Sequence, residues 1–274
     1  MAIALYGAPN EGKIYGMIDA DVTDAWDFIT RERAKGKRIT MTHVVTAAIG
    51  RAMGLHVPEV NVFVRRGKLV QREDMVVTVA VNMKDGAEMT NIKVRGAHQK
   101  TVFEIGQYIR ERAARARGGD EGKTAKNKYV LGNIPWPFRR GVFVFIRWIF
   151  TTLGISLPFM GLKEDSFGSM ILSNIGSHGL SIGMGALMPA ARLPGVIIMG
   201  REEEKPVVRD GEIVIRKILP LAGTFDHRVM DGYHAGVIAH HLRRYLENPE
   251  LLAVPPEEAA KMQEELDNEQ SAKT

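Results

Sequence analysis

The feature that most constrains the fold is a pair of alternating apolar runs separated by Asp210 and Gly211. An Asp-Gly pair between two such runs, here KPVVR and EIVIRKILPLAGTF, is the strongest short-range signal of a β-hairpin. The run MVVTVAVNM is apolar enough to lie inside a sheet. Further strand-like runs are KIYGMIDADV, EMTNIKVRG, FGSMILSNIG, LPGVIIMG, and the pair VNVFVRR and KLVQRE on either side of Gly67.

Four segments between these runs have apolar residues at helical spacing. A helix after Val22 is expected to be capped by Thr23 or Asp24, and a second is expected in THVVTAAIGRAMGLH. The segment TVFEIGQYIRERAARAR opens with Thr101 and has Glu104 three positions on, which is the pattern of a capping box. In the last helix, HAGVIAHHLRRYLENPELL, one face holds Ala235, Ile238, Leu242 and Tyr245.

We expect one domain over residues 1–274, because 45% hydrophobic and 25% charged residues are typical of a soluble globular protein. Its core is expected at about 13–252, with an atypical insert at about 118–165. The polar tail, 253–274, is expected to be a frayed helix or disordered. No secretory signal, lipoyl domain or peripheral subunit-binding domain is recognised. With no cysteine, disulfides and a cysteine nucleophile are excluded, and a cytoplasmic location is the default expectation.

Residues 141–160 contain one charged residue, Arg147, in a stretch long enough to cross a bilayer. Arg147, Gly154 and Pro158 interrupt this stretch, and a spanning helix would split what is otherwise one soluble domain. We therefore expect a buried element or one covered by an oligomer contact. A surface-lying amphipathic segment and a membrane span are the alternatives.

The net charge of +5 favours an anionic ligand or partner, because a positive field raises the local concentration of anions. The polyphosphate of coenzyme A and nucleic acid are candidates, and a basic surface that serves only solubility is the alternative. No zinc-finger spacing or RNA-binding signature is present, so nucleic acid is not expected.

The segment FDHRVMDG lies between the last predicted strand and the last predicted helix. A connection of this kind allows His227 to face a cleft. Its imidazole, with an ordinary pKa of about 6.5, can accept a proton at neutral pH and return it later. Asp231 follows four residues on, and Gly232 can adopt a backbone conformation that allows a tight turn. By composition alone, the pattern also fits a surface loop or a hydrogen-bonded histidine.

The motifs ILSNIG, VIIMG, KPVVRDGEIVIRKILPLAGTFDHRVMDG and NPELL give the region 166–252 a specific resemblance. This region is similar to the catalytic domain of the acyltransferase components of 2-oxoacid dehydrogenase complexes, with the motifs in the same order. A weaker similarity covers residues 13–117 through MTHVVTAAIGRAM, VPEVN and VTVAVNMKDG. The resemblance implies an α+β fold of the chloramphenicol acetyltransferase type, in which helices flank a central mixed sheet.

The resemblance also implies roles for three candidate catalytic residues, His227, Ser173 and Asp231. His227 would be the general base that takes the thiol proton of CoA or of the acyl acceptor. Ser173, in ILSNIG, would donate a hydrogen bond to the oxyanion, although a strand serine bonded to its neighbours is the alternative. Asp231 would fix the active-site loop through an arginine that the sequence does not identify.

The remaining motif residues, Asn174, Gly176 and Gly232, would shape the site rather than touch substrate. Members of the family are trimers with the active site between subunits, so the base and the oxyanion donor would come from different chains. A larger cubic core is a further possibility. No metal is expected, because His240 and His241 point to different faces of their helix.

The implied substrate is acyl-CoA, and a lipoyl group would be delivered by a separate partner protein. The sequence leaves the acyl group and the acceptor open. A small-molecule acceptor, as in the related chloramphenicol acetyltransferases, is one alternative, and a non-catalytic oligomeric scaffold is another.

Overall fold

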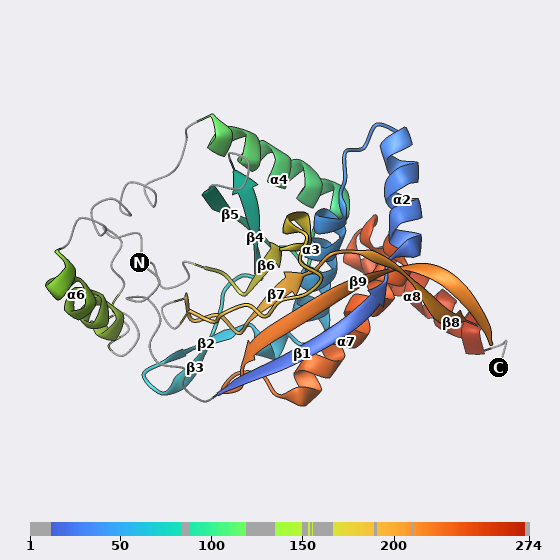
Figure 1. The fold of residues 1–274 in the computed structure, drawn as a ribbon. Helices are drawn as coiled ribbons and strands as arrows, with labels where there is room; N and C mark the ends of the chain where they lie inside the picture. The colour runs from blue at the N-terminus through green and yellow to red at the C-terminus, as the bar shows by residue number, and fades with distance from the viewer. Residues whose placement is uncertain are drawn as a thin grey trace.

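The structure of the chain, a computed structural model, describes residues 12–83, 88–118, 135–149, 153, 155, 167–188, 191–209 and 211–271. A seven-stranded mixed sheet organises it, in the order β1-β9-β7-β6-β4-β5, with β8 paired to β9 (Figure 1). β4, β6 and β7 run parallel to one another, and the other pairs are antiparallel. The strands are β1 (Lys13–Asp21), β4 (Val76–Met83), β5 (Glu88–Arg95), β6 (Met170–Asn174), β7 (Gly195–Met199), β8 (Glu203–Arg209) and β9 (Glu212–Asp226).

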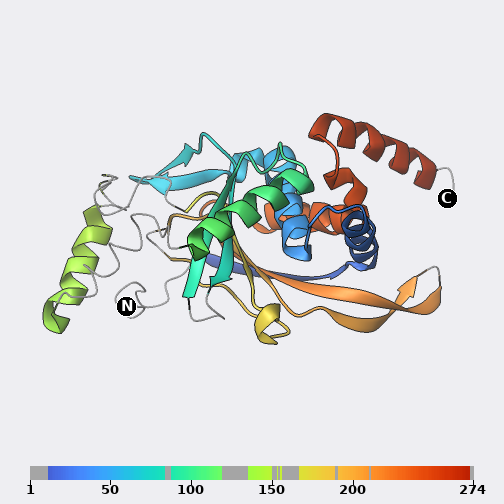
Figure 2. The ribbon, with the colours of Figure 1, turned by 90° about the horizontal axis from the view of Figure 1, so that it is seen from above.

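Helices cover one face of this sheet, and the chain between β6 and β7 covers part of the other (Figure 2). A separate hairpin pairs β2 (Val62–Arg65) with β3 (Lys68–Gln71). The α-helices are α2 (Thr23–Ala34), α3 (Met41–Arg51), α4 (Val102–Arg117), α6 (Trp136–Trp148), α7 (Gly232–Glu247) and α8 (Pro256–Ser271). Shorter helical turns are η1 (Ala52–His56), η2 (Pro58–Val60), η6 (Gly176–His178) and η8 (Pro249–Leu252).

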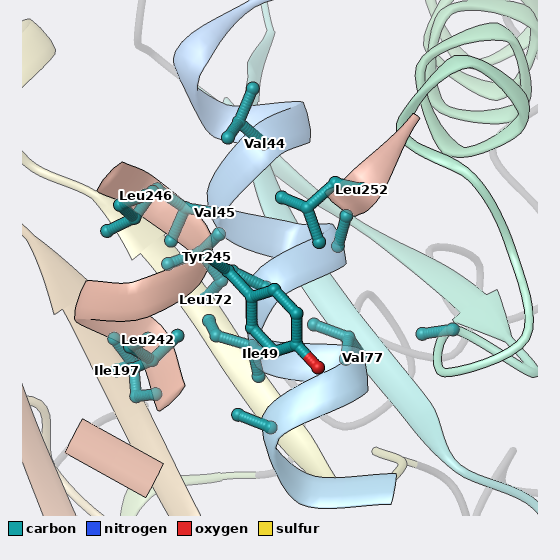
Figure 3. Close-up of a cluster of buried hydrophobic side chains, with 14 of the residues drawn as sticks. Val44, Val45, Ile49, Val77, Leu172, Ile197, Leu242, Tyr245, Leu246 and Leu252 are labelled. Atoms are coloured by element: carbon teal, nitrogen blue, oxygen red, sulfur yellow. The ribbon is translucent and has the colours of Figure 1, made fainter. Parts of the chain in front are cut away.

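The main core lies between the helices and the sheet, with α3 at its centre. Ile49 of α3 meets Leu242 and Tyr245 of α7 above Leu172 of β6 and Ile197 of β7 (Figure 3). Nearly every residue of α3 is buried because α2, α4, α7 and β4 surround it. This packing fixes the strands β4, β6 and β7 relative to α7, whose start adjoins the candidate site.

The side of the sheet without these helices is less completely covered. Met17, Ala222 and Ile198 are register partners across β1, β9 and β7, so their side chains share this face. Ala222 and Ile198 belong to a small second core cluster, but Met17 is 60% exposed. Tyr15 is exposed on the same face, and Leu180, Ile182 and Met184 are exposed in the chain between β6 and β7. Val208, Ile213 and Ile215 of the β8–β9 ribbon are also exposed, but alternation along β9 puts them on the face of Leu219 and Leu221.

Several elements confirm the sequence-based expectations. The β8–β9 hairpin forms as predicted, with Arg209 paired to Glu212 and Gly211 at φ +83°. Thr101 and Glu104 form the predicted capping box at the start of α4. The four-residue apolar face predicted for the last helix also packs against the core. The expected fold class, a mixed sheet with flanking helices, is confirmed.

One expectation needs correction, and for the C-terminal tail the structure favours the helical alternative. The helix α2 is not capped by Thr23 or Asp24, since Val22 occupies the N-cap position and the Asp21 carboxylate accepts the Thr23 N–H at 3.0 Å. Beyond Pro255 the described tail forms the helix α8, and Ala259 packs into the core.

Much of the expected insert, 118–165, lies outside the described residues. Its described part includes α6, which ends at Trp148. Within the described residues, no helix is both long and apolar enough to cross a membrane.

Gly176 follows β6 and lies close to Gly200, the residue that follows the neighbouring parallel strand β7. A Cβ atom at Gly176 would overlap the carbonyl oxygen of Gly200, a backbone atom that cannot swing away. We expect Gly176→Ala to lower the free energy of unfolding by about 1–3 kcal/mol, as overpacking does. Gly232→Ala is the matched control, because it adds a methyl group in the first turn of α7 with no atom within 4 Å. Denaturant unfolding that shows an equal loss in both variants would contradict this reading.

His43 makes the fold sensitive to acid. It is buried in the first turn of α3, where its Nδ1 accepts the Thr40 N–H at 3.2 Å. Burial, followed by the charges of Arg110 and Arg33, lowers the pKa of the imidazole from 6.5 to about 4. Because the unfolded chain binds this proton first, the stability is intact above about pH 6.5 and falls as the pH decreases toward 4.

Replacing His43 with glutamine keeps a side chain that can complete the capping box and removes the titration. Between pH 7 and pH 4 we expect the wild type to lose about 3 kcal/mol more of its unfolding free energy than His43→Gln does. Urea denaturation at a series of pH values measures this difference. If the unfolding free energies of the two proteins changed with pH in parallel, the lowered pKa of His43 would be contradicted.

Candidate active site

His227 lies directly after β9 and five residues before α7, on the connection that the sequence singled out. Its backbone N–H donates to the Gly12 carbonyl at 2.8 Å, and its Nδ1 lies 3.1 Å from the Met230 carbonyl oxygen. A carbonyl oxygen can only accept, so this contact assigns the proton of the neutral imidazole to Nδ1. The Nε2 lone pair is then available, on a residue exposed to solvent.

A compact turn holds the His227 backbone in place. Asp226 accepts bonds from the backbone N–H, Nε and Nη2 of Arg228, the last at 2.6 Å. The backbone N–H groups of Val229 and Met230 donate to the Asp226 carbonyl. Met230 is 1% exposed and anchors the turn in the main core. The turn therefore presents the imidazole from a rigid support.

Asp231 caps the helix α7. Its Oδ1 accepts the His234 backbone N–H at 3.2 Å and lies 2.7 Å from the His234 Nδ1. These two contacts lower the pKa of the Asp231 carboxyl. Among the described residues, the ion pair of Asp231 is with His234 and not with an arginine.

Gly232 does not form the tight turn that its residue type allowed. It is the first residue of α7 and is not among the described glycines with positive φ. Asp231, the residue before it, has the extended backbone that is usual for an N-cap residue, with φ −111° and ψ −170°. Glycine at 232 leaves open space beside the motif.

Ser173 lies near the carboxyl end of β6, between Ala80 of β4 and Ile198 of β7. Because side chains alternate along a strand and Leu172 points into the main core, Ser173 points to the side without the helices. Its register partner Ile198 belongs to the cluster on that same side. The partly buried hydroxyl therefore opens toward the face that keeps exposed apolar side chains.

The sheet register separates Ser173 from His227 within one chain. Ser173 is level with Ile198, which is level with Ala222 of β9. His227 is five residues beyond Ala222, which is roughly 17 Å along the strand direction. A single copy therefore does not bring the two side chains to one reacting carbon.

Asn174 and Gly176 shape the end of β6. The Asn174 Oδ1 accepts the Ser177 N–H at 3.2 Å, and the Ser177 hydroxyl donates to the Asn174 carbonyl at 3.1 Å. Gly176 lies in the next turn, against Gly200. Together these contacts fix the backbone that follows Ser173.

A basic pocket of about 810 Å³ opens beside Asn174 and Ser177. Arg33 and Arg110 support its rim by donating to the carbonyls of Ile39 and Arg38. His43 also faces the pocket, and its lowered pKa keeps it neutral at pH 7. Among the described residues that line the pocket there is no Asp or Glu, and the cationic ones are Arg33, Lys37, Arg38, Arg110 and Arg117.

Sequence reasoning did not identify this pocket. Its cations come from two arginine-rich segments, RERAKGKR at 31–38 and RERAARAR at 110–117, which lie far apart in the chain. The only sequence feature that pointed to the pocket was that both segments are rich in arginine. Among the described residues, no group of three or more His, Asp or Glu side chains could hold a metal ion.

The sequence model of the family "2-oxoacid dehydrogenases acyltransferase (catalytic domain)" matches residues 10–125 and 161–254. The dihydrolipoyllysine-residue acetyltransferase component of the pyruvate dehydrogenase complex from Staphylococcus epidermidis is 28% identical over 244 residues, which are 86% of this chain and 46% of that protein. The corresponding component of the acetoin cleaving system of Bacillus subtilis is 27% identical over 224 residues, 81% of this chain and 45% of that protein. The chain thus spans about half the length of these curated relatives.

Solved structures share the fold. A probable dihydrolipoamide acetyltransferase from Listeria monocytogenes superposes with a TM-score of 0.65 at 17% identity, covering 86% of this chain and 84% of that one. Chloramphenicol acetyltransferase superposes with a TM-score of 0.50 at 14% identity, covering 86% and 88%. The fold is therefore of the chloramphenicol acetyltransferase type, with a mixed central sheet and flanking helices. The family match spans most of the sequence, and the chain belongs to the family of 2-oxoacid dehydrogenase acyltransferase catalytic domains.

Proposed function

We propose that the chain transfers an acyl group between CoA and a thiol acceptor such as a dihydrolipoyl group. The observation that carries this proposal is the exposed imidazole of His227, whose Nδ1 is engaged by the Met230 carbonyl while Nε2 stays open. This is the geometry that a general base requires. Ser173 is the proposed oxyanion donor.

The proposed reaction exchanges one thioester for another. Nε2 of His227 takes the proton of the attacking thiol, whose thiolate is the effective nucleophile. The new C–S bond converts the thioester carbonyl to an oxyanion, which accepts a hydrogen bond from the Ser173 hydroxyl. Collapse of this intermediate breaks the old C–S bond, and the departing thiolate takes the proton back from the imidazolium.

The basic pocket is the proposed binding site for the phosphates of CoA. Its cations face no carboxylate in the lining, which suits a polyanion. The pocket reaches Asn174, the residue after Ser173, so a pantetheine arm could run from the pocket to the oxyanion donor. The proposed cofactor-binding residues are therefore the five cations that line the pocket.

The separation of His227 and Ser173 is the reason to propose a homotrimer with shared sites. One copy would supply the base and its neighbour the hydroxyl. The β8–β9 ribbon offers a contact surface, because its register places Val208 beside Ile213 and Pro206 beside Ile215 on one face. Three of these side chains are at least 70% exposed, and covering them would stabilise an assembly. A solved relative forms the cubic core of a pyruvate dehydrogenase complex, and a larger shell is a further step of the same proposal.

A related enzyme supports the assignment of residues. In the dihydrolipoamide acetyltransferase of Azotobacter vinelandii, a serine, a histidine and an asparagine four residues after that histidine have been investigated for their roles in catalysis. The present chain has Asp231 four residues after His227, in addition to Ser173. We infer that Asp231 positions the loop, as its cap on α7 suggests.

A small-molecule acceptor is the second candidate. Residues 126–160 lie outside the family match and directly precede the segment that leads into β6, the strand of Ser173. An insertion there could alter which acceptor reaches the site. Turnover with acetyl-CoA and free dihydrolipoamide favours the thiol acceptor, whereas activity confined to small alcohols or amines favours the alternative.

His227→Ala should reduce acyl transfer from acetyl-CoA by about 10²-fold or more, because the attacking thiol loses its base. His240→Ala is the matched control, since His240 is an exposed histidine on α7 outside the turn. Initial rates with dihydrolipoamide measure both variants, and thermal unfolding verifies that they are folded. Undiminished transfer in His227→Ala would remove the general base from the proposal, and no transfer by the wild type with any acceptor would favour a scaffold.

If the pocket binds the phosphates of CoA, removing its cations should weaken the binding of CoA but not of pantetheine, which lacks the nucleotide phosphates. Arg38 and Arg117 line the pocket, and within the described residues their guanidinium groups have no hydrogen-bonding partner. Replacing both with alanine should raise the Kd of CoA by about tenfold or more, because charge-assisted bonds to phosphate are lost. The same variant should bind pantetheine as the wild type does. Arg115→Ala, on α4 but outside the pocket, should leave both affinities unchanged, and calorimetry that shows equal effects of all these changes would contradict the assignment.

A further inference from the structure

Helix α6 carries an aromatic face that the described chain leaves uncovered. Phe138 and Phe145 are seven residues apart and Trp148 is three further on, so the helical period places them on one side. Their side chains are 66%, 59% and 49% exposed, and the rings of Phe145 and Trp148 stack with centroids 6.3 Å apart. Within the described residues, no other helix or strand packs extensively against α6. Both ribbon views place it at the end of the molecule opposite β8 and the C-terminus (Figures 1 and 2).

The stretch of sequence that contains this helix is strongly basic. Residues 122–163 contain seven Lys and Arg residues and no Asp or Glu. This excess is larger than the net charge of +5, so the rest of the chain is slightly acidic. Arg140 is exposed, and its position two residues after Phe138 puts it on the opposite side of α6 from the aromatic face. The surroundings of α6 therefore attract anions, while its aromatic face needs an apolar cover.

The β2–β3 hairpin extends the same surface. The Arg66 Nε donates to the Leu153 carbonyl at 2.9 Å, which ties the hairpin tip to the segment that follows α6. Beside it, Lys68 is exposed and Leu69 is 58% exposed. The hairpin and α6 lie on the same side of the molecule in both views (Figures 1 and 2). Leu69 and Lys68 of the hairpin therefore extend the surface formed by the aromatic face of α6.

We propose that α6 and the tip of the β2–β3 hairpin lie in the interface of a membrane with anionic lipids. Aromatic side chains on one side of a helix and cations around it are the features of interfacial helices. The 13 residues of α6 span only about 20 Å, which is shorter than the hydrocarbon core of a bilayer, so the helix lies on the membrane rather than across it. Contact between two copies through α6 is disfavoured, because it would bring two cationic segments together. Residues 126–160, which include α6, are outside the family match, and neither α6 nor the β2–β3 hairpin contributes a residue to the basic pocket.

Flotation of the full chain with phospholipid vesicles tests this proposal. Vesicles of phosphatidylcholine and phosphatidylglycerol should carry the wild type, pure phosphatidylcholine vesicles should carry much less, and high salt should weaken the binding. The double variant Phe145→Ser and Trp148→Ser should lower the partition coefficient by about tenfold or more. Leu55→Ser is the matched control, since Leu55 is 41% exposed on η1 and should not affect binding. Thermal unfolding verifies that the variants are folded.

Three results would overturn the proposal. The wild type could fail to float with anionic vesicles, or the double variant could float as well as the wild type. Alternatively, the double variant could change the sedimentation coefficient while vesicle binding is absent, which would show that a second copy of the chain covers α6. Loss of acyl transfer in His227→Ala has no bearing on any of these outcomes, so the two proposals fail independently.

Discussion

The pairing of β9 with β7 is the constraint on which the whole site depends. β6 and β7 run parallel, and β9 runs against them, so the carboxyl ends of β6 and β9 lie at opposite ends of the sheet. Ser173 is at one of these ends and His227 is at the other. A shift of β6 by one residue against β4 and β7 would turn the hydroxyl of Ser173 into the core beneath α3. Catalysis by this pair therefore requires both a fixed register and more than one copy of the chain.

The two faces of the sheet differ in how completely the single chain covers them. On one face, α3 is packed on all sides, and Arg51 reaches from it to the carbonyls of Leu251 and Val254. This arrangement fixes α7 and the turn that holds His227. The other face keeps Tyr15 and Met17 exposed in the single chain, and the β8–β9 ribbon keeps Val208, Ile213 and Ile215 exposed, although apolar side chains in such numbers are usually covered. The proposed trimer would explain both the exposed apolar side chains and the separation of the two proposed catalytic residues.

Local signals made much of this structure predictable from the sequence. The Asp210-Gly211 turn and the capping box at Thr101 involve neighbouring residues, so a short pattern contains all the information. The motif around His227 was found because of its resemblance to a known family. The basic pocket was missed because Arg33 and Arg117 come from helices that meet only after folding.

The predictions were wrong where neighbouring residues were about equally suited to the same structural role. At the start of α2, Asp21, Thr23 and Asp24 all have side chains that can cap a helix, and the Asp21 carboxylate makes the contact that Thr23 or Asp24 was expected to make. Gly232 was expected to provide a turn, but Asp231 supplies the extended backbone and Gly232 enters the helix. The sequence did not decide whether α6 is buried or exposed, because its apolar run fits a buried element as well as an interfacial helix. Burial cannot be read from periodicity when the assembly is unknown.

The most direct test of the central claim is complementation between two inactive variants. His227→Ala and Ser173→Ala chains, purified separately and then unfolded and refolded together, would form mixed assemblies. If the site is shared, a Ser173-bearing chain beside a His227-bearing chain restores an intact site. We predict that the mixture regains acyl transfer well above the sum of the two variants. Activity no greater than that sum, in mixed assemblies shown to have formed, would contradict a site built from His227 of one copy and Ser173 of another.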